Sequence, residues 1–180
     1  MPDGTKIIFD TNRDGNREIY TMNTDGTGLV NISNHAESDL CACFSPTGTK
    51  IAFQTDRDQA YSGEVYSMNA DGTGQIKLSD SVNSNRDPYW SPNGLKILFV
   101  SFRNGSDDEI FIMDADGSNE INLSNNGGDD MRPGWSPDGT KVIFDSGRGT
   151  NNEIYIMDPD GSNQVNISND SGWDGCASWR

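Results

Sequence analysis

Trp135-Ser136-Pro137-Asp138-Gly139-Thr140-Lys141-Val142-Ile143-Phe144 is the stretch that decides the fold, because it recurs along the chain. Close copies span residues 44–53 and 90–99, and the chain opens inside a fourth copy at Pro2-Asp3-Gly4. The prolines of the four copies lie 44, 46 and 45 residues apart. A period of this length indicates a single-domain repeat protein with four units, approximately 1–44, 45–90, 91–135 and 136–180.

Each unit has the pattern of four short antiparallel strands. In the third unit, residues 96–100 and 109–113 are apolar runs rich in strand-forming residues. Residues 120–124 alternate apolar and polar side chains, as a half-buried outer strand does, and residues 131–135 supply the fourth strand. A sheet of this size cannot bury both of its faces alone. We therefore predict an all-β fold, a β-propeller whose four-stranded blades stack around a common axis.

The C-terminal segment predicts how the blades are joined into a ring. The chain starts just after the Trp-Ser step of a repeat and finishes with Asp174-Gly175-Cys176-Ala177-Ser178-Trp179-Arg180, which is a copy of an inner strand. We expect this segment to complete the first blade, the velcro closure of propellers, and so to remove two open sheet edges. The sequence does not decide between a four-bladed ring made by one chain and an eight-bladed ring made by two chains joined head to tail.

The repeat resembles that of the TolB-like (WD-repeat-like) β-propellers over essentially the whole chain. The matching features are the Trp-Ser-Pro-Asp-Gly-Thr-Lys string, the following Glu153-Ile154-Tyr155, and the turn Asp158-Pro159-Asp160-Gly161. The resemblance implies a periplasmic or secreted propeller that holds a partner protein or ligand, usually with six or more blades, so four repeats are a departure. Some relatives add a serine-peptidase domain, but this sequence has no Gly-x-Ser-x-Gly motif.

The composition excludes several classes of partner. The formal net charge is −15, from 28 acidic against 13 basic residues. This charge argues against binding nucleic acid or an anionic membrane, while it is compatible with cationic partners or metal ions. No secretory signal is recognisable, since Met1-Pro2-Asp3 already lies in a repeat. Export with a removed signal and a cytoplasmic location therefore both remain open.

Candidate site residues lie where each inner strand begins, near the mouth of the predicted central channel. Four of them recur five residues before the strand aromatic: Asp39, Asn85, Asp130 and Asp174. Oxygen ligands from Asp39, Asp130 and Asp174 could hold a hard cation such as calcium. The same side chains could instead accept hydrogen bonds from backbone groups or from the periodic arginines. Trp173 and His35 break the period in the loops that lead to inner strands, so they are candidates for contacting a ligand.

Other periodic residues are expected to be structural. The arginines Arg13, Arg57, Arg103 and Arg148 and the glutamates Glu18, Glu64, Glu109 and Glu153 recur at constant phase. We expect them to form exposed ion pairs across the hairpins. Cys41 and Cys176 occupy equivalent positions, which leaves open a disulfide between them or free buried thiols.

The sequence thus favours a non-catalytic binding or scaffold propeller. We expect it to hold a protein, a peptide or a cation at the loop face around the channel, and a homodimer is a further expectation. One alternative is a hydrolase or lyase that uses the channel-mouth carboxylates. Another is a repeat fragment without a ligand of its own.

Overall fold

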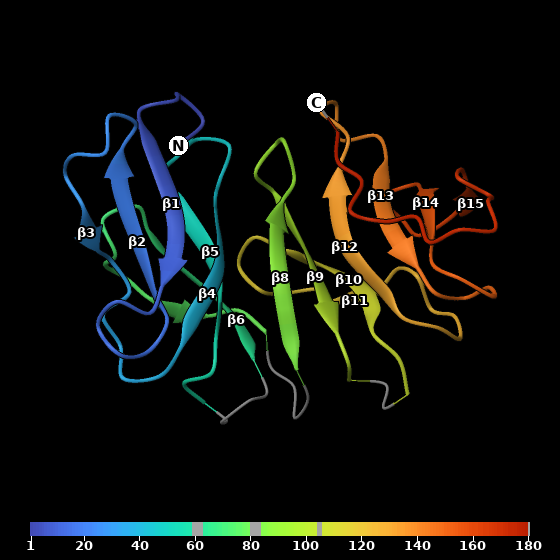
Figure 1. The fold of residues 1–180 in the computed structure, drawn as a ribbon, viewed down its shortest axis with the longest axis horizontal. Helices are drawn as coiled ribbons and strands as arrows, with labels where there is room; N and C mark the ends of the chain where they lie inside the picture. The colour runs from blue at the N-terminus through green and yellow to red at the C-terminus, as the bar shows by residue number, and fades with distance from the viewer. Residues whose placement is uncertain (59–62, 80–83, 104–105, 180) are drawn as a thin grey trace.

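The computed structural model describes residues 1–58, 63–79, 84–103 and 106–179, which form an all-β chain (Figure 1). The strands of these residues belong to one three-stranded and three four-stranded antiparallel sheets. No helix among them is long and apolar enough to cross a membrane. The predicted fold class, a propeller built of antiparallel blades, is therefore confirmed.

We call the sheets blades 1 to 4 in chain order. Blade 1 holds β1 (Lys6–Thr11), β2 (Glu18–Asn23) and β3 (Val30–Asn31), and blade 2 holds β4 (Asp39–Phe44), β5 (Lys50–Thr55), β6 (Glu64–Asn69) and β7 (Ile76–Lys77). Blade 3 holds β8 (Asn85–Trp90), β9 (Lys96–Ser101), β10 (Glu109–Asp114) and β11 (Ile121–Asn122). Blade 4 holds β12 (Asp130–Trp135), β13 (Val142–Ser146), β14 (Glu153–Met157) and β15 (Val165–Asn166). Blades 2 to 4 each take their inner strand from the end of one sequence unit and their other strands from the next.

The Ser-Pro-x-Gly step forms the tight turn between an inner strand and its neighbour. In blade 4, the backbone N–H of Ser136 donates to the carbonyl of Lys141 (2.9 Å), and the N–H of Lys141 donates to Ser136 Oγ (2.9 Å). Gly139 completes the turn at φ +71°, a value that costs glycine little. Because this step recurs at constant phase, all inner strands enter their sheets in the same way.

Each complete inner strand carries a bulge that its sequence does not announce. The pairing register with the second strand shifts by one residue at the same place in blades 2, 3 and 4. Cys41, Asp87 and Arg132 lie at these places with φ of 52°, 53° and 52°. A left-handed backbone costs such residues about 1–2 kcal/mol each, so the sheet geometry outweighs the local preference.

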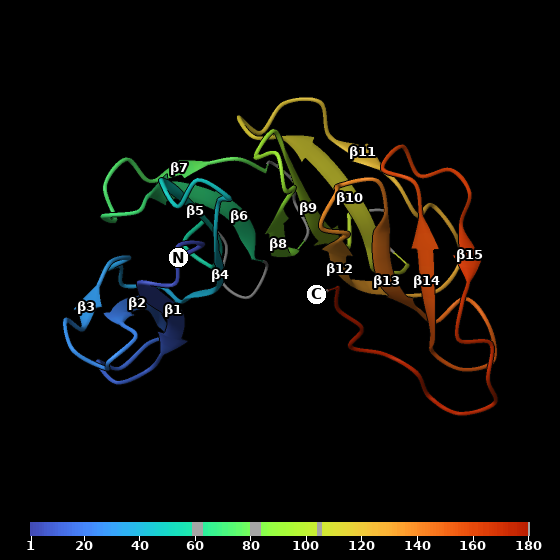
Figure 2. The ribbon, with the colours of Figure 1, turned by 90° about the horizontal axis from the view of Figure 1, so that it is seen from above.

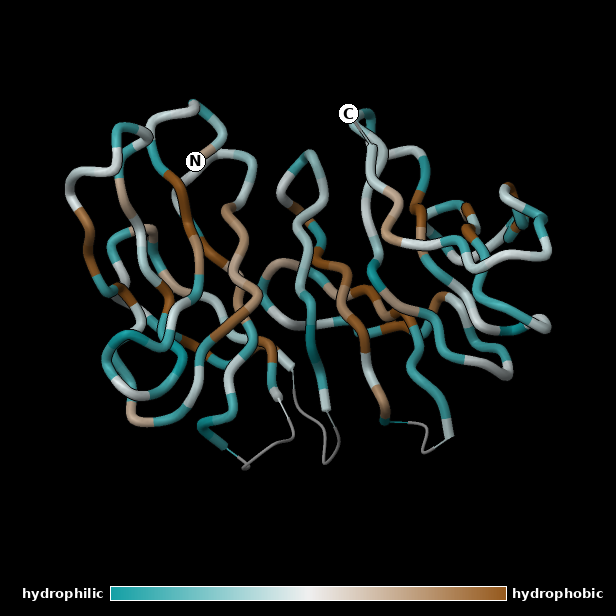
Figure 3. The backbone as a smooth tube through the Cα atoms, viewed as in Figure 1, coloured by the Kyte–Doolittle hydropathy of each residue, from teal (hydrophilic) through white to brown (hydrophobic). Residues whose placement is uncertain are grey.

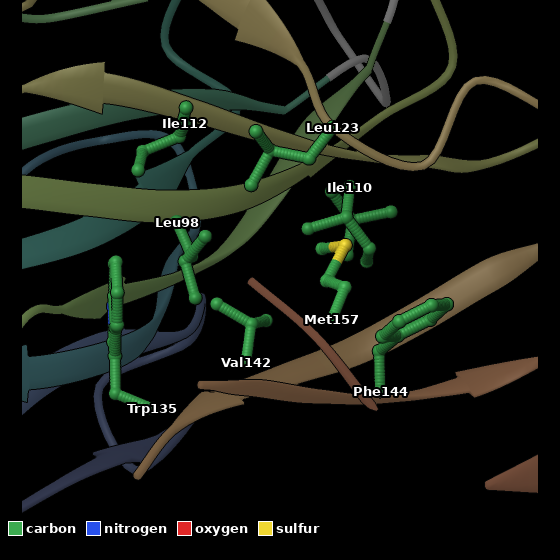
Figure 4. Close-up of a cluster of buried hydrophobic side chains, with 9 residues drawn as sticks. Leu98, Ile110, Ile112, Leu123, Trp135, Val142, Phe144 and Met157 are labelled. Atoms are coloured by element: carbon green, nitrogen blue, oxygen red, sulfur yellow. The ribbon is translucent and has the colours of Figure 1, made fainter. Parts of the chain in front are cut away.

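The hydrophobic core lies between the blades, not within any one of them. Three clusters of buried side chains occupy the junctions of blades 1 and 2, 2 and 3, and 3 and 4. At the last junction Leu98 and Ile110 of blade 3 pack against Trp135, Val142 and Met157 of blade 4 (Figure 4). Full burial of each such side chain stabilises the fold by about 1.5–3 kcal/mol. Figure 3 shows the apolar residues gathered along the strands, with mostly hydrophilic connections.

The prediction of exposed pairs between the periodic arginines and glutamates is wrong. The four glutamates are buried; Glu64, for example, is 2% exposed. Its carboxylate accepts a hydrogen bond from Ser79 Oγ, which itself accepts from the N–H of Val65. Hydrogen bonding of this kind compensates for the desolvation of a buried carboxylate, whereas an exposed ion pair between long side chains across a hairpin adds little stability.

The four blades form an open arc in which blade 1 and the C-terminal segment lie apart (Figure 2). β1 is the inner edge of blade 1, and residues 174–179 pair with no strand among the residues that the structure describes. Trp179 is 41% exposed. The expected closure of blade 1 within one chain is therefore not met, because three junctions of this curvature carry the chain round only part of a circle. The two-chain ring stays a prediction.

Candidate functional site

The arc has two faces, one at each end of its inner strands, and both offer candidate sites. The loop face, at the bottom of Figure 1, is the end at which the inner strands begin. The turn face, at the top of Figure 1, carries the Ser-Pro-x-Gly turns. The channel-mouth residues predicted from the sequence belong to the loop face.

An arginine neutralises the predicted carboxylate in blade 2. The Arg57 guanidinium stacks on Phe53 and Tyr66, with its central carbon 5.5 and 5.0 Å from their ring centres. Its Nη2 donates to both carboxylate oxygens of Asp39, at 2.9 and 2.8 Å. Asp39 is fully buried. Burial raises the pKa of Asp39, while hydrogen bonds from Thr55 and the charge of Arg57 act in the opposite direction.

Blades 3 and 4 repeat this arrangement. Arg103 Nη2 donates to Asn85 Oδ1 (3.2 Å), and Arg148 Nη2 donates to Asp130 (3.2 and 3.4 Å). Asn85 and Asp130 are also fully buried. Of the two roles left open by the sequence, the structure shows hydrogen bonding to the arginines for these side chains. In the part of the chain that the structure describes, no group of three or more His, Cys, Asp or Glu side chains is placed to hold a metal.

The other predicted residues of the loop face make different contacts from these three. Asp174 is half-buried, and its N–H donates to the carbonyl of Asn152 (2.9 Å). Trp173 is 61% exposed. His35 is half-buried; its Nδ1 accepts from the N–H of Glu37 (3.1 Å), and its own N–H donates to Glu18 Oε1 (3.0 Å). Trp173 is thus the predicted site residue that presents the most free surface.

The turn face carries a groove of about 320 Å³ that the sequence analysis did not predict. Blades 2, 3 and 4 each contribute the aromatic that ends the inner strand and the proline of the following turn, and the C-terminal segment contributes Trp179. Its lining is Cys43, Phe44, Pro46, Tyr89, Trp90, Pro92, Trp135, Ser136, Pro137 and Trp179. None of these residues carries a formal charge at pH 7, so the groove is neutral and aromatic.

The groove has both exposed and buried rings. Tyr89 is 47% exposed and Trp179 41%, whereas Trp90 and Trp135 are buried in the blade junctions. No described residue accepts a hydrogen bond from the indole Nε1–H of Trp90 or of Trp135. Buried polar groups are rarely left without a partner, so two such donors in one place mark the turn face as unusual.

One signal in the sequence could have revealed the groove. Tyr89 precedes the strand aromatic, where the equivalent residues are Cys43, Gly134 and Ser178. A large exposed aromatic at a position that varies between repeats is the kind of departure from the period that pointed to Trp173. By contrast, Trp90 and Trp135, two of the aromatics that recur at constant phase, are core residues.

Comparison with known proteins places the chain among propellers. A family model described as the TolB beta propeller domain matches residues 1–179. The protein TolB homolog of Chlorobaculum tepidum is 44% identical over 50 residues, which are 28% of this chain and 12% of that protein. A structure from Agrobacterium tumefaciens, assigned as TolB, superposes with a TM-score of 0.82 at 26% identity, over 92% of this chain and 61% of that one. The chain thus spans only part of the length of these relatives.

Some proteins of similar fold are enzymes. The oligogalacturonate lyase of Vibrio parahaemolyticus superposes with a TM-score of 0.73 at 13% identity, over 95% of this chain and 51% of that one. At this identity the likeness extends to the fold alone.

Proposed function

Because the chain belongs to the TolB beta propeller family, we propose that it is a non-catalytic binding propeller that holds a segment of a partner protein. The observation that carries the proposal is the neutral aromatic groove of the turn face. Aromatic side chains supply large contact areas with little loss of side-chain entropy, and they dominate the energetics of many protein interfaces.

The chemistry of the groove favours an extended peptide. Proline-containing and other extended segments dock on grooves lined by aromatic rings, since they lose little conformational entropy on binding. Tyr89 and Trp179 offer exposed ring surface, and the hydroxyl of Tyr89 offers a hydrogen bond. We therefore infer an uncharged, apolar segment of a protein as the ligand.

The loop face is the weaker candidate for the same role. Its carboxylates at Asp39 and Asp130 are buried against Arg57 and Arg148, which leaves neither free for calcium or for acid–base chemistry in this structure. This arrangement gives no support to the hydrolase or lyase alternative. Trp173 is the observation that favours a ligand at the loop face. We infer a periplasmic or secreted location from the family, with a cytoplasmic one as the alternative.

A peptide selection with two matched variants tests the proposed face. A displayed peptide library is panned against the 180-residue chain, and the dissociation constant of a selected peptide is measured by titration calorimetry. Tyr89→Ala removes an exposed ring from the groove and is expected to weaken binding about tenfold or more. Trp173→Ala removes an exposed ring from the loop face, away from the groove, and is expected to leave the affinity unchanged.

The reverse pattern, in which Trp173→Ala weakens binding and Tyr89→Ala does not, would move the site to the loop face. Failure to select any peptide would contradict the proposed function itself. Far-ultraviolet circular dichroism of both variants controls for folding.

A further inference from the structure

Blade 1 lies at one end of the arc, and blade 4 with residues 174–179 lies at the other. We propose that these two ends are complementary and that a second copy of this chain joins them head to tail. In this arrangement residues 174–179 of the second copy lie against β1 as the inner strand of blade 1. The proposal concerns an interaction surface that shares Trp179 with the peptide-binding groove, but its evidence does not rest on that groove.

Residues 174–179 already have the conformation of an inner strand. The N–H of Asp174 donates to the carbonyl of Asn152 in blade 4, as Asp39, Asn85 and Asp130 donate to the blades before them. Cys176 has φ of 60°, which matches the bulge residues of the three paired inner strands. Among the described residues, the segment therefore leaves blade 4 as an inner strand that is paired with no sheet, while blade 1 is a sheet that has no inner strand.

Charge complementarity joins the same two elements. Arg13 stacks on Phe9 and Tyr20, 5.7 and 4.7 Å from their ring centres, as its equivalents do in the other blades. Those equivalents reach the first residue of their inner strand, whereas Arg13 forms no ion pair with any residue that the structure describes. Asp174 is the equivalent of Asp39, and no described cation pairs with it. Docking would bring Arg13 and Asp174 together as Arg57 and Asp39 are.

The apolar end faces are complementary in the same way. A Cβ on Gly72, Gly117 or Gly161 would lie 2.3–2.6 Å from a carbonyl oxygen of the preceding blade, at Ile32, Leu78 or Leu123. These three carbonyl residues are 4–7% exposed. Gly26 is the equivalent glycine in blade 1, and a Cβ there would meet nothing within 4 Å. Ile167 is the equivalent carbonyl residue after blade 4, and it is 51% exposed.

The Ser-Pro-x-Gly turns show a second open contact. Gly94 and Gly139 each face the proline of the preceding turn, with 3.7 Å from an added Cβ to Pro46 and Pro92 respectively. Gly4 of blade 1 has no such neighbour, and Pro137 of blade 4 is exposed. One junction contact is not matched. Gln75 and Gln164 donate side-chain hydrogen bonds to backbone carbonyls of the preceding blade, but the equivalent residue of blade 1 is Leu29, which cannot donate one.

A second copy fits both ends at once. Apart from the contact at Leu29, the surface of blade 1 matches that of blade 4, and the two lie apart in the arc (Figure 2). Contacts between different surfaces of identical chains close into a ring when the rotation allows it and otherwise extend into filaments. Two arcs of four blades make eight blades, and closing them forms the junction twice, so the pair is favoured over the open polymer.

The test measures the mass of the 180-residue chain by light scattering during size-exclusion chromatography. We expect twice the chain mass of 19.7 kDa. Arg13→Asp and Asp174→Arg each place like charges at both junctions and are expected to weaken the dimer tenfold or more. The double variant restores opposite charges and is expected to recover the dimer. Asp107→Arg is the control, since it makes the same charge change on a middle blade.

A wild-type monomer, or assemblies larger than two, would overturn the proposal. So would a dimer that neither charge reversal weakens, because its contact would lie elsewhere. Circular dichroism shows whether each variant is folded, and a misfolded single variant is replaced by Gly26→Ala, which adds a methyl group only at the proposed junction. The affinity of the Tyr89 groove for its selected peptide is read separately, so failure of either proposal is recognised on its own.

Discussion

At the scale of single residues, the turn aspartates show how the repeats depend on charge. Asp138 accepts hydrogen bonds from Ser136 Oγ, from the N–H of Thr140 and from Thr140 Oγ1, and these lower its pKa to about 2. Hydrogen bonds from the following Thr or Ser also lower the pKa of five further aspartates, Asp3, Asp25, Asp71, Asp116 and Asp160. The ionised form is thus the one that the turns require.

Asp138→Asn is expected to fold and to reduce the acid sensitivity of the chain. The folded pKa of Asp138 lies below its ordinary value of 3.8, so its contribution to stability is present above pH 3.8 and is lost as the pH falls toward 2. Asn93 shows that an amide fits, because its Oδ1 accepts from Ser91 Oγ (2.8 Å) and the N–H of Leu95 (3.0 Å). Urea unfolding at pH 5 and pH 2 should show a smaller loss of stability for the variant. An equal loss in both proteins would refute this account of the turn.

Arg57→Ala is expected to destabilise the chain by about 3–5 kcal/mol, because it leaves the Asp39 carboxylate buried without its partner. The control is Arg17→Ala, which removes an exposed pair with Asp10 (3.1 Å) and should cost about 1 kcal/mol or less. Urea denaturation at pH 7 measures both. Similar costs for the two variants would mean that the stacked arginines do not support the inner strands.

At the scale of elements, the strands follow from residue type, but the bulge does not. The runs of β-branched and aromatic residues at β9 and β10 predict strands, and the Ser-Pro-x-Gly steps predict their turns. Cys41, Asp87 and Arg132 share a left-handed backbone but no chemistry, so nothing in their side chains announces the bulge. Its cause is the pairing with the second strand, which only the folded sheet supplies.

The candidate site, too, could be predicted only in part from the sequence. The sequence predicts that Asp39, Asn85 and Asp130 are equivalent, and the structure places them in equivalent environments. The sequence left open that the arginines bind these side chains but could not decide between them and the glutamates, because that choice depends on which groups lie within reach in the folded blade.

Gly117→Ala tests the contact between blades, with Gly26→Ala as its counterpart. Both glycines have left-handed φ, +89° and +84°, so both substitutions carry a local cost of about 1 kcal/mol. Only at Gly117 would the new Cβ lie 2.5 Å from a backbone oxygen of the preceding blade. We expect Gly117→Ala to cost about 1–3 kcal/mol more than Gly26→Ala in thermal unfolding at dilutions where the chain is monomeric. Equal costs would show that the blades are not held at this distance.

At the scale of the whole molecule, the period of the sequence predicts the number of blades per chain but not the size of the ring. The angle between neighbouring blades depends on the volumes of side chains such as Leu98, Trp135 and Val142 within each junction. Small differences add up around the axis, so a repeat pattern alone could not decide between closure by one chain and closure by two. The structure shows an open arc, and we propose that its two ends join through a second copy.

Hydrogen exchange in β1 tests this account most directly. In the closed arrangement, the β1 amides that do not bond to β2 face the inner strand of a second copy and gain protection. We predict slow exchange over residues 6–11 at high protein concentration, comparable to that over β5 and β9, and fast exchange after dilution, with β5 and β9 unchanged. Fast exchange of these β1 amides at every concentration would contradict the claim that the two ends of the arc form one junction.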